Sequence, residues 1–281
     1  MTNLLRTDLA SEAFEQAGGD LALPGLLARR ETLFGQPLFA VEISSDEAAE
    51  KLGKPEGHYY TLSCKAPLSR SAASFSDLAA AVAALIRRCG VPESGDILVA
   101  ALGNPDITPD ALGSLCAANV LVTRHLKAGG DPLWADFAPV SVCRPGVLGT
   151  AGVESAAQIA ALCEAIHPSL VLAVDALAGS DAGRLCRSIQ VCDSGISPGS
   201  GVCNNRERID RETLGVPVTV LGVPTVADAV NFGADESLRG LFVTPRDIDS
   251  AVRACARVIA YGINLALHPK LSVEDIDALV G

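Results

Sequence analysis

Short apolar runs that alternate with helical segments constrain the fold of this chain more than any other feature. Residues 97–102 and 170–174 are uninterrupted apolar runs with the length of a buried strand. Residues 77–89 form an Ala-rich helical segment, and residues 153–166 carry apolar side chains at the 3–4 spacing of an amphipathic helix. This alternation predicts an α/β fold in which helices cover both faces of a mainly parallel, twisted sheet.

Further elements are predicted on either side of this alternation. Residues 37–43 and 58–64 are rich in β-forming residues and predict an extra N-terminal strand pair, with a polar, turn-containing segment between them. Residues 188–191 and 216–221 are two more strand candidates, each followed by a loop that contains glycine. Residues 108–122 predict a loop that enters a helix.

The last helix is the best-defined element of the sequence. Thr244 can cap its start, and Pro245 suits its first turn. It should end before His268, which precedes a proline. Its apolar stripe consists of Ile248, Val252, Cys255, Ile259 and Ile263. By contrast, residues 1–30 show no clear period.

The charge and the apolar runs exclude several kinds of partner. The chain of 281 residues carries 22 basic and 33 acidic side chains, which gives a formal charge of −11. A chain this acidic has no electrostatic footprint for nucleic acid or for an anionic membrane. The apolar runs are also far shorter than the roughly 18 residues that a membrane-spanning helix needs. We therefore expect neither nucleic acid nor a membrane as a direct partner.

The N-terminus and the cysteines indicate a cytoplasmic protein. Asp8 and Glu12 interrupt the N-terminus before an apolar core forms, so no secretory signal is predicted. The nine cysteines are odd in number, which favours reduced thiols that pack the core as small apolar residues. Cys186, Cys192 and Cys203 lack the spacing of a zinc finger.

Two aspartates at strand ends are the candidate catalytic residues. Asp110 follows the strand at 97–102, and Asp175 comes directly after the strand at 170–174. Reacting groups collect at the carboxyl ends of strands in open parallel sheets, and an unpaired charge is costly to bury for packing alone. The two carboxylates can work as an acid and a base, or they can bind a divalent ion. Asp110 can also serve only as a helix N-cap.

Loops near these strand ends supply candidate substrate-binding residues. Asn104 follows the first strand. Gly152 and Glu154 lie in a loop that leads into a helix and suits a close backbone approach to a substrate, although Glu154 also fits as a first-turn residue that interacts with the helix dipole. Asp193 and Gly199 lie in a long Gly/Ser loop, which is typical of a binding loop or of a plain turn. The serines of this loop lack a GxSxG elbow, so a Ser–His hydrolase is disfavoured.

Several long strings match one known family, in the same order and over nearly the whole chain. They are Arg6-Thr7-Asp8-Leu9-Ala10, Gly103-Asn104, Thr108-Pro109-Asp110-Ala111-Leu112-Gly113, Leu121-Val122-Thr123-Arg124-His125-Leu126, Asp175-Ala176-Leu177-Ala178, Ile196-Ser197-Pro198-Gly199-Ser200-Gly201-Val202 and Gly222-Val223-Pro224-Thr225-Val226. With them the chain resembles the spore germination endopeptidases, which begin the degradation of small acid-soluble spore proteins when a spore germinates.

The resemblance implies an atypical aspartic peptidase whose two aspartates match Asp110 and Asp175. More distantly the chain is similar to the hydrogenase maturation endopeptidases, which implies their fold. Those enzymes recognise a metal with a third ligand, a histidine after Ser-Pro, whereas Gly199 follows Ser197-Pro198 here. This departure favours a carboxylate pair with a bound water and no metal or other cofactor. The alternatives are a metal-dependent maturation-type peptidase and a non-catalytic binding relative.

The resemblance also implies processing, substrates and assembly. Members are made as zymogens that cut themselves between Asp and Leu, and here that bond joins Asp8 and Leu9. The chain would then consist of a propeptide, residues 1–8, and a single peptidase domain, residues 9–281. Substrates are cut after an acidic residue and before a hydrophobic residue that is followed by Ala. The family forms homotetramers and acts in the spore core, but residues 227–242 are short where typical members carry a long insertion, so assembly and zymogen control can differ.

Overall fold

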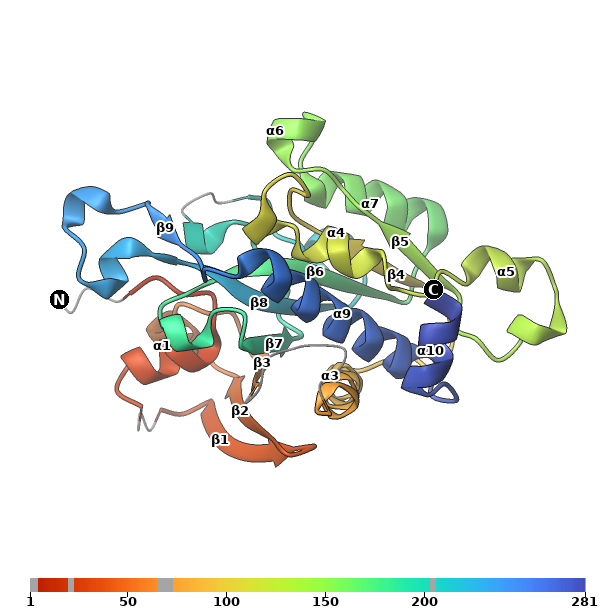
Figure 1. Cartoon of the computed structure of the whole chain (residues 1–281), viewed down its shortest axis with the longest axis horizontal. Coiled ribbons are helices and arrows are strands. Elements are labelled where there is room, and N and C mark those ends of the chain that lie inside the picture. The colour runs from red at the N-terminus through yellow and green to blue at the C-terminus, as the bar shows by residue number, and fades with distance from the viewer. Residues whose placement is uncertain (1–4, 20–22, 65–72, 203–205, 281) are drawn as a thin grey trace.

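A single β-sheet forms the centre of the molecule (Figure 1). The computed structural model describes residues 5–19, 23–64, 73–202 and 206–280. The sheet has nine strands in the order β1-β2-β3-β7-β8-β6-β4-β5, with β9 paired to β8. The strands are β1 (Leu26–Leu33), β2 (Gln36–Ile43), β3 (Gly57–Ser63), β4 (Ile97–Ala101), β5 (Val140–Cys143), β6 (Leu170–Gly179), β7 (Ser188–Cys192), β8 (Val218–Asp228) and β9 (Phe242–Val243).

The sheet is mixed, not mainly parallel. The neighbours β5, β4, β6 and β8 pair in parallel, whereas β1, β2, β3, β7 and β8 pair antiparallel along the other half. The predicted mainly parallel sheet is therefore wrong for the sheet as a whole. The reason is the short connection from β6 to β7, which contains one 3₁₀ turn (Ala182–Arg184). A parallel return needs a crossover of roughly a dozen or more residues, so β7 returns antiparallel.

The predicted N-terminal strand pair is confirmed and has a third member. β2 and β3 pair antiparallel, and β1 pairs antiparallel with β2. β1 and β2 are joined at Phe34 and Gly35, whose φ angles of 47° and 74° suit the tight hairpin turns that match strand twist. β1 was missed because it is an edge strand whose side chains are mostly exposed or half-buried, so the apolar alternation of a strand is weak there.

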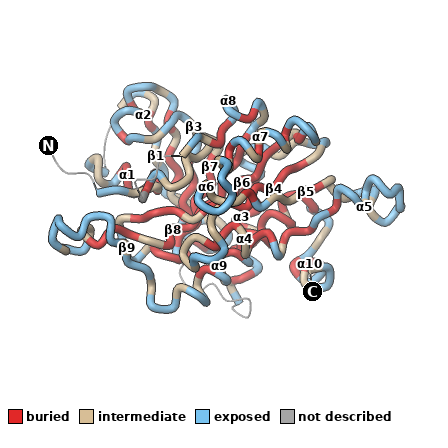
Figure 2. Tube along the Cα trace, turned by 90° about the horizontal axis from the view of Figure 1, so that it is seen from above, coloured by how far each residue is buried: buried red, intermediate tan, exposed pale blue. Residues whose placement is uncertain are grey.

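Helices cover both faces of the sheet, as predicted. The helices are α1 (Ala10–Gln16), α2 (Asp46–Leu52), α3 (Phe75–Cys89), α4 (Leu112–Ala117), α5 (Arg124–Ala128), α6 (Leu148–Ala151), α7 (Ser155–Ile166), α8 (Arg211–Leu214), α9 (Ile248–Leu267) and α10 (Val273–Val280). Buried side chains of α3, α4, α9 and α10 share one core cluster with one sheet face. Those of α1, α2, α7 and α8 share a second cluster with the other face. Figure 2 shows the central strands largely buried, with α2 and α5 mostly exposed.

The described cysteines support the predicted packing role. Eight of the nine are described, all as free thiols, and most of them are buried. Cys203 lies outside the described residues, as do residues 1–4 of the expected propeptide.

The last helix begins later than predicted but ends where expected. Its N-cap is Asp247, not Thr244, and α9 starts at Ile248. The Thr244 hydroxyl donates to the carbonyl of Pro245 at 3.2 Å, and Thr244 lies outside the helix, before its N-cap. The C-cap is His268, which confirms the predicted end.

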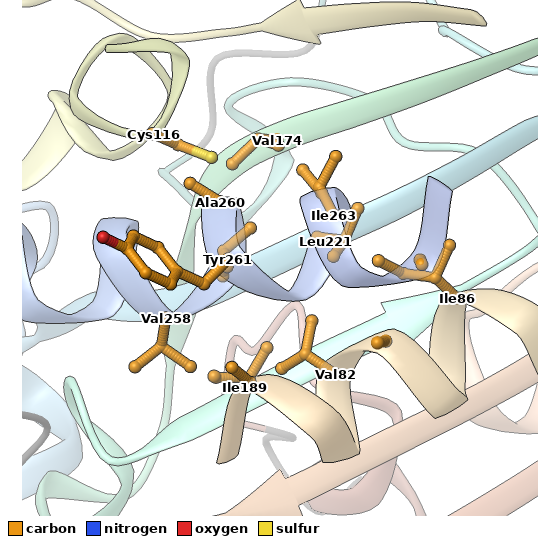
Figure 3. Close-up of a cluster of buried hydrophobic side chains, with 14 of the residues drawn as sticks. Val82, Ile86, Cys116, Val174, Ile189, Leu221, Val258, Ala260, Tyr261 and Ile263 are labelled. Atoms are coloured by element: carbon orange, nitrogen blue, oxygen red, sulfur yellow. The ribbon is translucent and has the colours of Figure 1, made fainter. Parts of the chain in front are cut away.

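The contact between α3 and α9 depends on Gly262. A Cβ atom at this position would lie 2.4 Å from Cγ1 and 2.6 Å from Cβ of Val82. Val82 is fully buried, and Figure 3 shows it within the cluster that joins α3 to α9. Because the neighbouring side chains are also buried, neither helix has room to yield.

Gly262→Ala should therefore lower the free energy of unfolding by about 1–3 kcal/mol through overpacking. In a helix without this contact, a change from Gly to Ala usually stabilises the protein by about 1 kcal/mol. The sign of the change in stability therefore shows whether the close contact is present. Urea denaturation measures it. Adding Val82→Ala should recover part of the loss, and a net gain in stability from Gly262→Ala alone would contradict the close approach.

Candidate active site

Asp175 lies inside β6 and not beyond its end. The strand continues to Gly179 because the residues after Val174 keep pairing with β8, past a bulge between Leu177 and Ala178. The predicted strand end at residue 174 is therefore wrong, because the charge of Asp175 was taken as the end of an apolar run. The side chain is 4% exposed, and its Oδ1 accepts the N–H of Ala176 at 3.0 Å.

The surroundings of Asp175 favour the protonated carboxyl. Burial raises its pKa well above the usual range, and the negative charges of Asp110 and Asp8 raise the pKa further. The hydrogen bond from Ala176 acts in the opposite direction and is the smallest of these influences. Asp175 therefore keeps its proton at pH values at which an ordinary aspartate is ionised.

Asp110 lies at the end of a 3₁₀ turn, Thr108–Asp110, in the loop after β4. Its Oδ2 accepts the backbone N–H of Asn104 at 2.7 Å. The N-cap of α4 is Ala111, without a side-chain cap, so the interpretation of Asp110 as a helix N-cap is wrong. Burial raises the pKa of Asp110, and the N–H of Asn104 opposes that rise by stabilising the charged form.

The topology of the sheet brings the two aspartates together. β4 and β6 pair in parallel, and the N–H of Leu102, just beyond β4, donates to the carbonyl of Val174 at 2.9 Å. The loop that carries Asp110 therefore leaves the sheet beside Asp175. The effect of the Asp110 charge on the pKa of Asp175 reports the same proximity. Two carboxyl groups whose pKa values are set apart by their surroundings are a usual basis for acid and base roles.

The N-terminal segment binds beside this pair. The N–H of Asp8 donates to the carbonyl of Ala178 at 2.8 Å, and the N–H of Ala178 donates to Oδ2 of Asp8 at 2.8 Å. Leu9 is fully buried. Asp8 is thus attached to the same strand as Asp175, three residues further along, and its charge raises the pKa of Asp175.

Gln190 holds the backbone on both sides of the Asp8–Leu9 bond. Its Nε2 donates to the carbonyl of Asp8 at 3.2 Å, and its Oε1 accepts the N–H of Ala10 at 2.8 Å. In the sheet, Gly222 of β8 is the register partner of both Gln190 and Asp175. Gln190 and Asp175 therefore lie in one row across three strands, with a glycine between them. Sequence reasoning missed Gln190, although a polar residue inside the apolar strand β7 is a signal for it.

Glu12 is a second residue whose role the sequence did not indicate. It is 2% exposed, and its carboxylate accepts the N–H groups of Ser180 at 2.7 Å and Asp181 at 3.1 Å. Arg184 lies 3.9 Å from its Oε1. These bonds fasten α1 to the end of β6, and therefore hold the segment that precedes α1 in place.

The candidate substrate-binding residues have separate positions. Asn104 contacts Asp110, as described above. Gly152, with a φ angle of 69°, is the C-cap of α6, and Gly199, with a φ angle of 75°, lies in a turn. Glu154 is 3.6 Å from Arg206, an ion pair that joins the start of α7 to the loop after residue 205. Asp193 accepts from Nδ1 and the backbone N–H of His58, both at 2.7 Å, on the antiparallel half of the sheet, so the structure does not bring Asp193 to Asp175.

Two general properties of the described residues bear on the class of protein. Within the described ranges, no group of three or more His, Cys, Asp or Glu side chains is arranged to hold a metal ion. Among the helices that the structure describes, none combines the length and the apolar character needed to cross a membrane.

Known proteins resemble this chain over nearly its whole length. The family described as germination protease matches residues 12–238. The chain is 35% identical to a germination protease of Caldanaerobacter subterraneus subsp. tengcongensis, with 98% of each chain covered. It is 34% identical to one from Clostridium perfringens, covering 97% of this chain and 98% of the relative, and 31% identical to one from Bacillus subtilis, covering 97% and 95%. The first alignment spans 318 positions, more than the 281 residues here, so that relative carries residues without a counterpart in this chain.

Proposed function

The chain belongs to the germination protease family, and from that premise we propose that it is an endopeptidase that starts the degradation of small acid-soluble spore proteins during germination, with Asp110 and Asp175 as its catalytic pair. The observation that carries the proposal is the position of these two carboxyl groups. Asp175 is buried and Asp110 is half-buried, and burial raises the pKa of both. Asp175 lies on β6, and Asp110 lies in the loop after β4, the parallel neighbour of β6.

The different surroundings of the pair assign the two roles. Asp175 is nearly fully buried and keeps its proton, so it is the general acid. Asp110 is less buried, and the N–H of Asn104 stabilises its ionised form, so it is the general base. Asp110 removes a proton from a water molecule, whose oxygen attacks the peptide carbonyl carbon. Asp175 gives its proton to the amide nitrogen as the C–N bond breaks, and the two products are a carboxylic acid and an amine.

Self-processing at the Asp8–Leu9 bond is part of the same proposal. The residues around this bond, Asp8-Leu9-Ala10, match the expected cleavage sequence of an acidic residue, a hydrophobic residue and Ala. Gln190 binds the carbonyl of this bond, in the same row of the sheet as Asp175. An N–H donor on a peptide carbonyl stabilises the charge that develops on its oxygen during attack. The segment is therefore held in a form that suits cleavage.

Mass spectrometry of the N-terminus tests the proposed activity and specificity together. After incubation, the chain should lose residues 1–8 and expose Leu9 as a new terminus. An added peptide with the sequence Arg-Thr-Asp-Leu-Ala should be cut between Asp and Leu, and the matched peptide with Asn in place of Asp should stay intact. An unchanged N-terminus together with an uncut Asp peptide, under all conditions of pH and ionic strength tried, would contradict the proposal.

A further inference from the structure

The carboxylate of Asp8 is bound by donors that converge from two parts of the chain. Oδ2 accepts the backbone N–H of Ala178 at 2.8 Å, and Oδ1 accepts the hydroxyl of Ser200 at 2.9 Å. A Cβ atom on Gly201 would lie 2.3 Å from Oδ2. Only glycine therefore lets this loop approach the carboxylate so closely.

Basic side chains lie near the same position. The side-chain nitrogen of Lys54 donates to the carbonyl of Thr7 at 2.9 Å. Burial lowers the pKa of Lys54, and the negative charge of Asp8 opposes this fall by favouring the charged ammonium form. An open cavity of about 350 Å³ continues from Asp8, and Arg6 and Lys51 line it together with Lys54. The hydrogen-bond donors and the nearby basic side chains therefore suit an anionic side chain better than a neutral or positive one.

The backbone of Asp8 is held in the manner of a bound peptide. Its N–H donates to the backbone carbonyl of Ala178 in β6, and its carbonyl accepts from the side-chain amide of Gln190 in β7. Main-chain hydrogen bonds to a strand, combined with a pocket for one side chain, are the usual way in which a protein recognises an extended peptide.

From these contacts we infer that Ala178, Ser200, Gly201 and Lys54 form the subsite that recognises the acidic side chain on the N-terminal side of the scissile bond, and that Asp8 fills this subsite from within the chain. The inference rests on the proposed function and deepens it. While Asp8 is bound, an acidic residue of another protein cannot enter. The subsite becomes free when the segment that ends at Asp8 leaves.

Binding of a peptide that cannot be cut tests the subsite without any need for catalysis. The probe is a fluorescein-labelled hexapeptide that ends in glutamate amide, and its control ends in glutamine amide. An internal occupant lowers the apparent affinity in proportion to the fraction of sites that it fills. In the full chain, Asp8→Ala should therefore tighten binding of the Glu peptide by about tenfold, measured by fluorescence anisotropy, and leave the Gln peptide unchanged.

A second substitution, added to the Asp8→Ala chain, tests which residues bind the Glu peptide. Ser200→Ala and Lys54→Met should each cancel most of the tenfold gain for the Glu peptide, while Ser237→Ala, a matched exposed serine outside the site, should not. Equal affinity for the Glu and Gln peptides in Asp8→Ala would overturn the inference. Glu-selective binding that survives both Ser200→Ala and Lys54→Met would also overturn it. Selective binding without any cleavage would support the subsite and count against the proposed function alone.

Discussion

Asp175→Asn is expected to reduce peptide cleavage by about 10²–10⁴-fold, the usual contribution of a positioned acid or base. The change keeps the shape of the side chain but removes the proton that Asp175 would give to the leaving nitrogen. Because the side chain is almost fully buried, water has no direct path to replace it. Cleavage of the Arg-Thr-Asp-Leu-Ala peptide, followed by chromatography, measures the loss, and the Asp8–Leu9 bond of the same variant should stay intact.

Two further variants separate the catalytic pair from the other acidic residues. Asp110→Asn should cause a loss of the same order, because the pair acts as a unit and such losses are not additive. Asp193→Asn is the matched control, since Asp193 is bound to His58 on the antiparallel half of the sheet, and it should keep most of the activity. If either Asp110→Asn or Asp175→Asn folds and retains activity close to that of the unchanged chain, the proposed pair is incorrect.

The sequence predicted those parts of the fold that local patterns determine. The buried strands β4, β6 and β8 and the amphipathic helices α7 and α9 have strong patterns of their own, and all of them are present. Asp175 could be selected from the sequence because it is a charge directly after an apolar run, and Asp110 because it lies in the loop that follows another such run. The sequence alone did not show that the two side chains meet; the parallel pairing of β4 with β6 places the loop of Asp110 beside Asp175.

The remaining features depend on contacts between distant residues, which a local pattern does not contain. The position of β7 in the sheet depends on its antiparallel pairing with β3 and β8. The burial of Asp175 inside β6 depends on continued pairing with β8. Asp8 meets Ala178 and Ser200 only because the N-terminal segment crosses the end of β6. The two members of each of these contacts lie far apart in the sequence, so the spacing of residues could not reveal the contacts.

Asp175 should also lower the stability of the folded chain at neutral pH by a measurable amount. Asp175 has a pKa in the folded chain that is raised above its unfolded value, so folding favours its protonated form. The stability that this group contributes is fully present below the unfolded pKa and is lost as pH rises through the folded pKa. Each unit by which the folded pKa exceeds the unfolded one costs about 1.4 kcal/mol when the group is ionised.

Asp175→Asn should therefore make the chain more stable at neutral pH while it removes activity. The variant has no charge to bury, so its advantage should be small at about pH 3.5, where the folded chain is protonated and the unfolded chain is mostly protonated, and should grow as pH rises from there. Urea denaturation of both chains at pH 3.5, 5 and 7 measures the difference in the free energy of unfolding. Asp106→Asn, a change at an exposed aspartate, is the control, and it should alter the free energy of unfolding little at any of these pH values. A stability difference that is independent of pH would mean that Asp175 is not held in the protonated form, and the assignment of Asp175 as the general acid would fail with it.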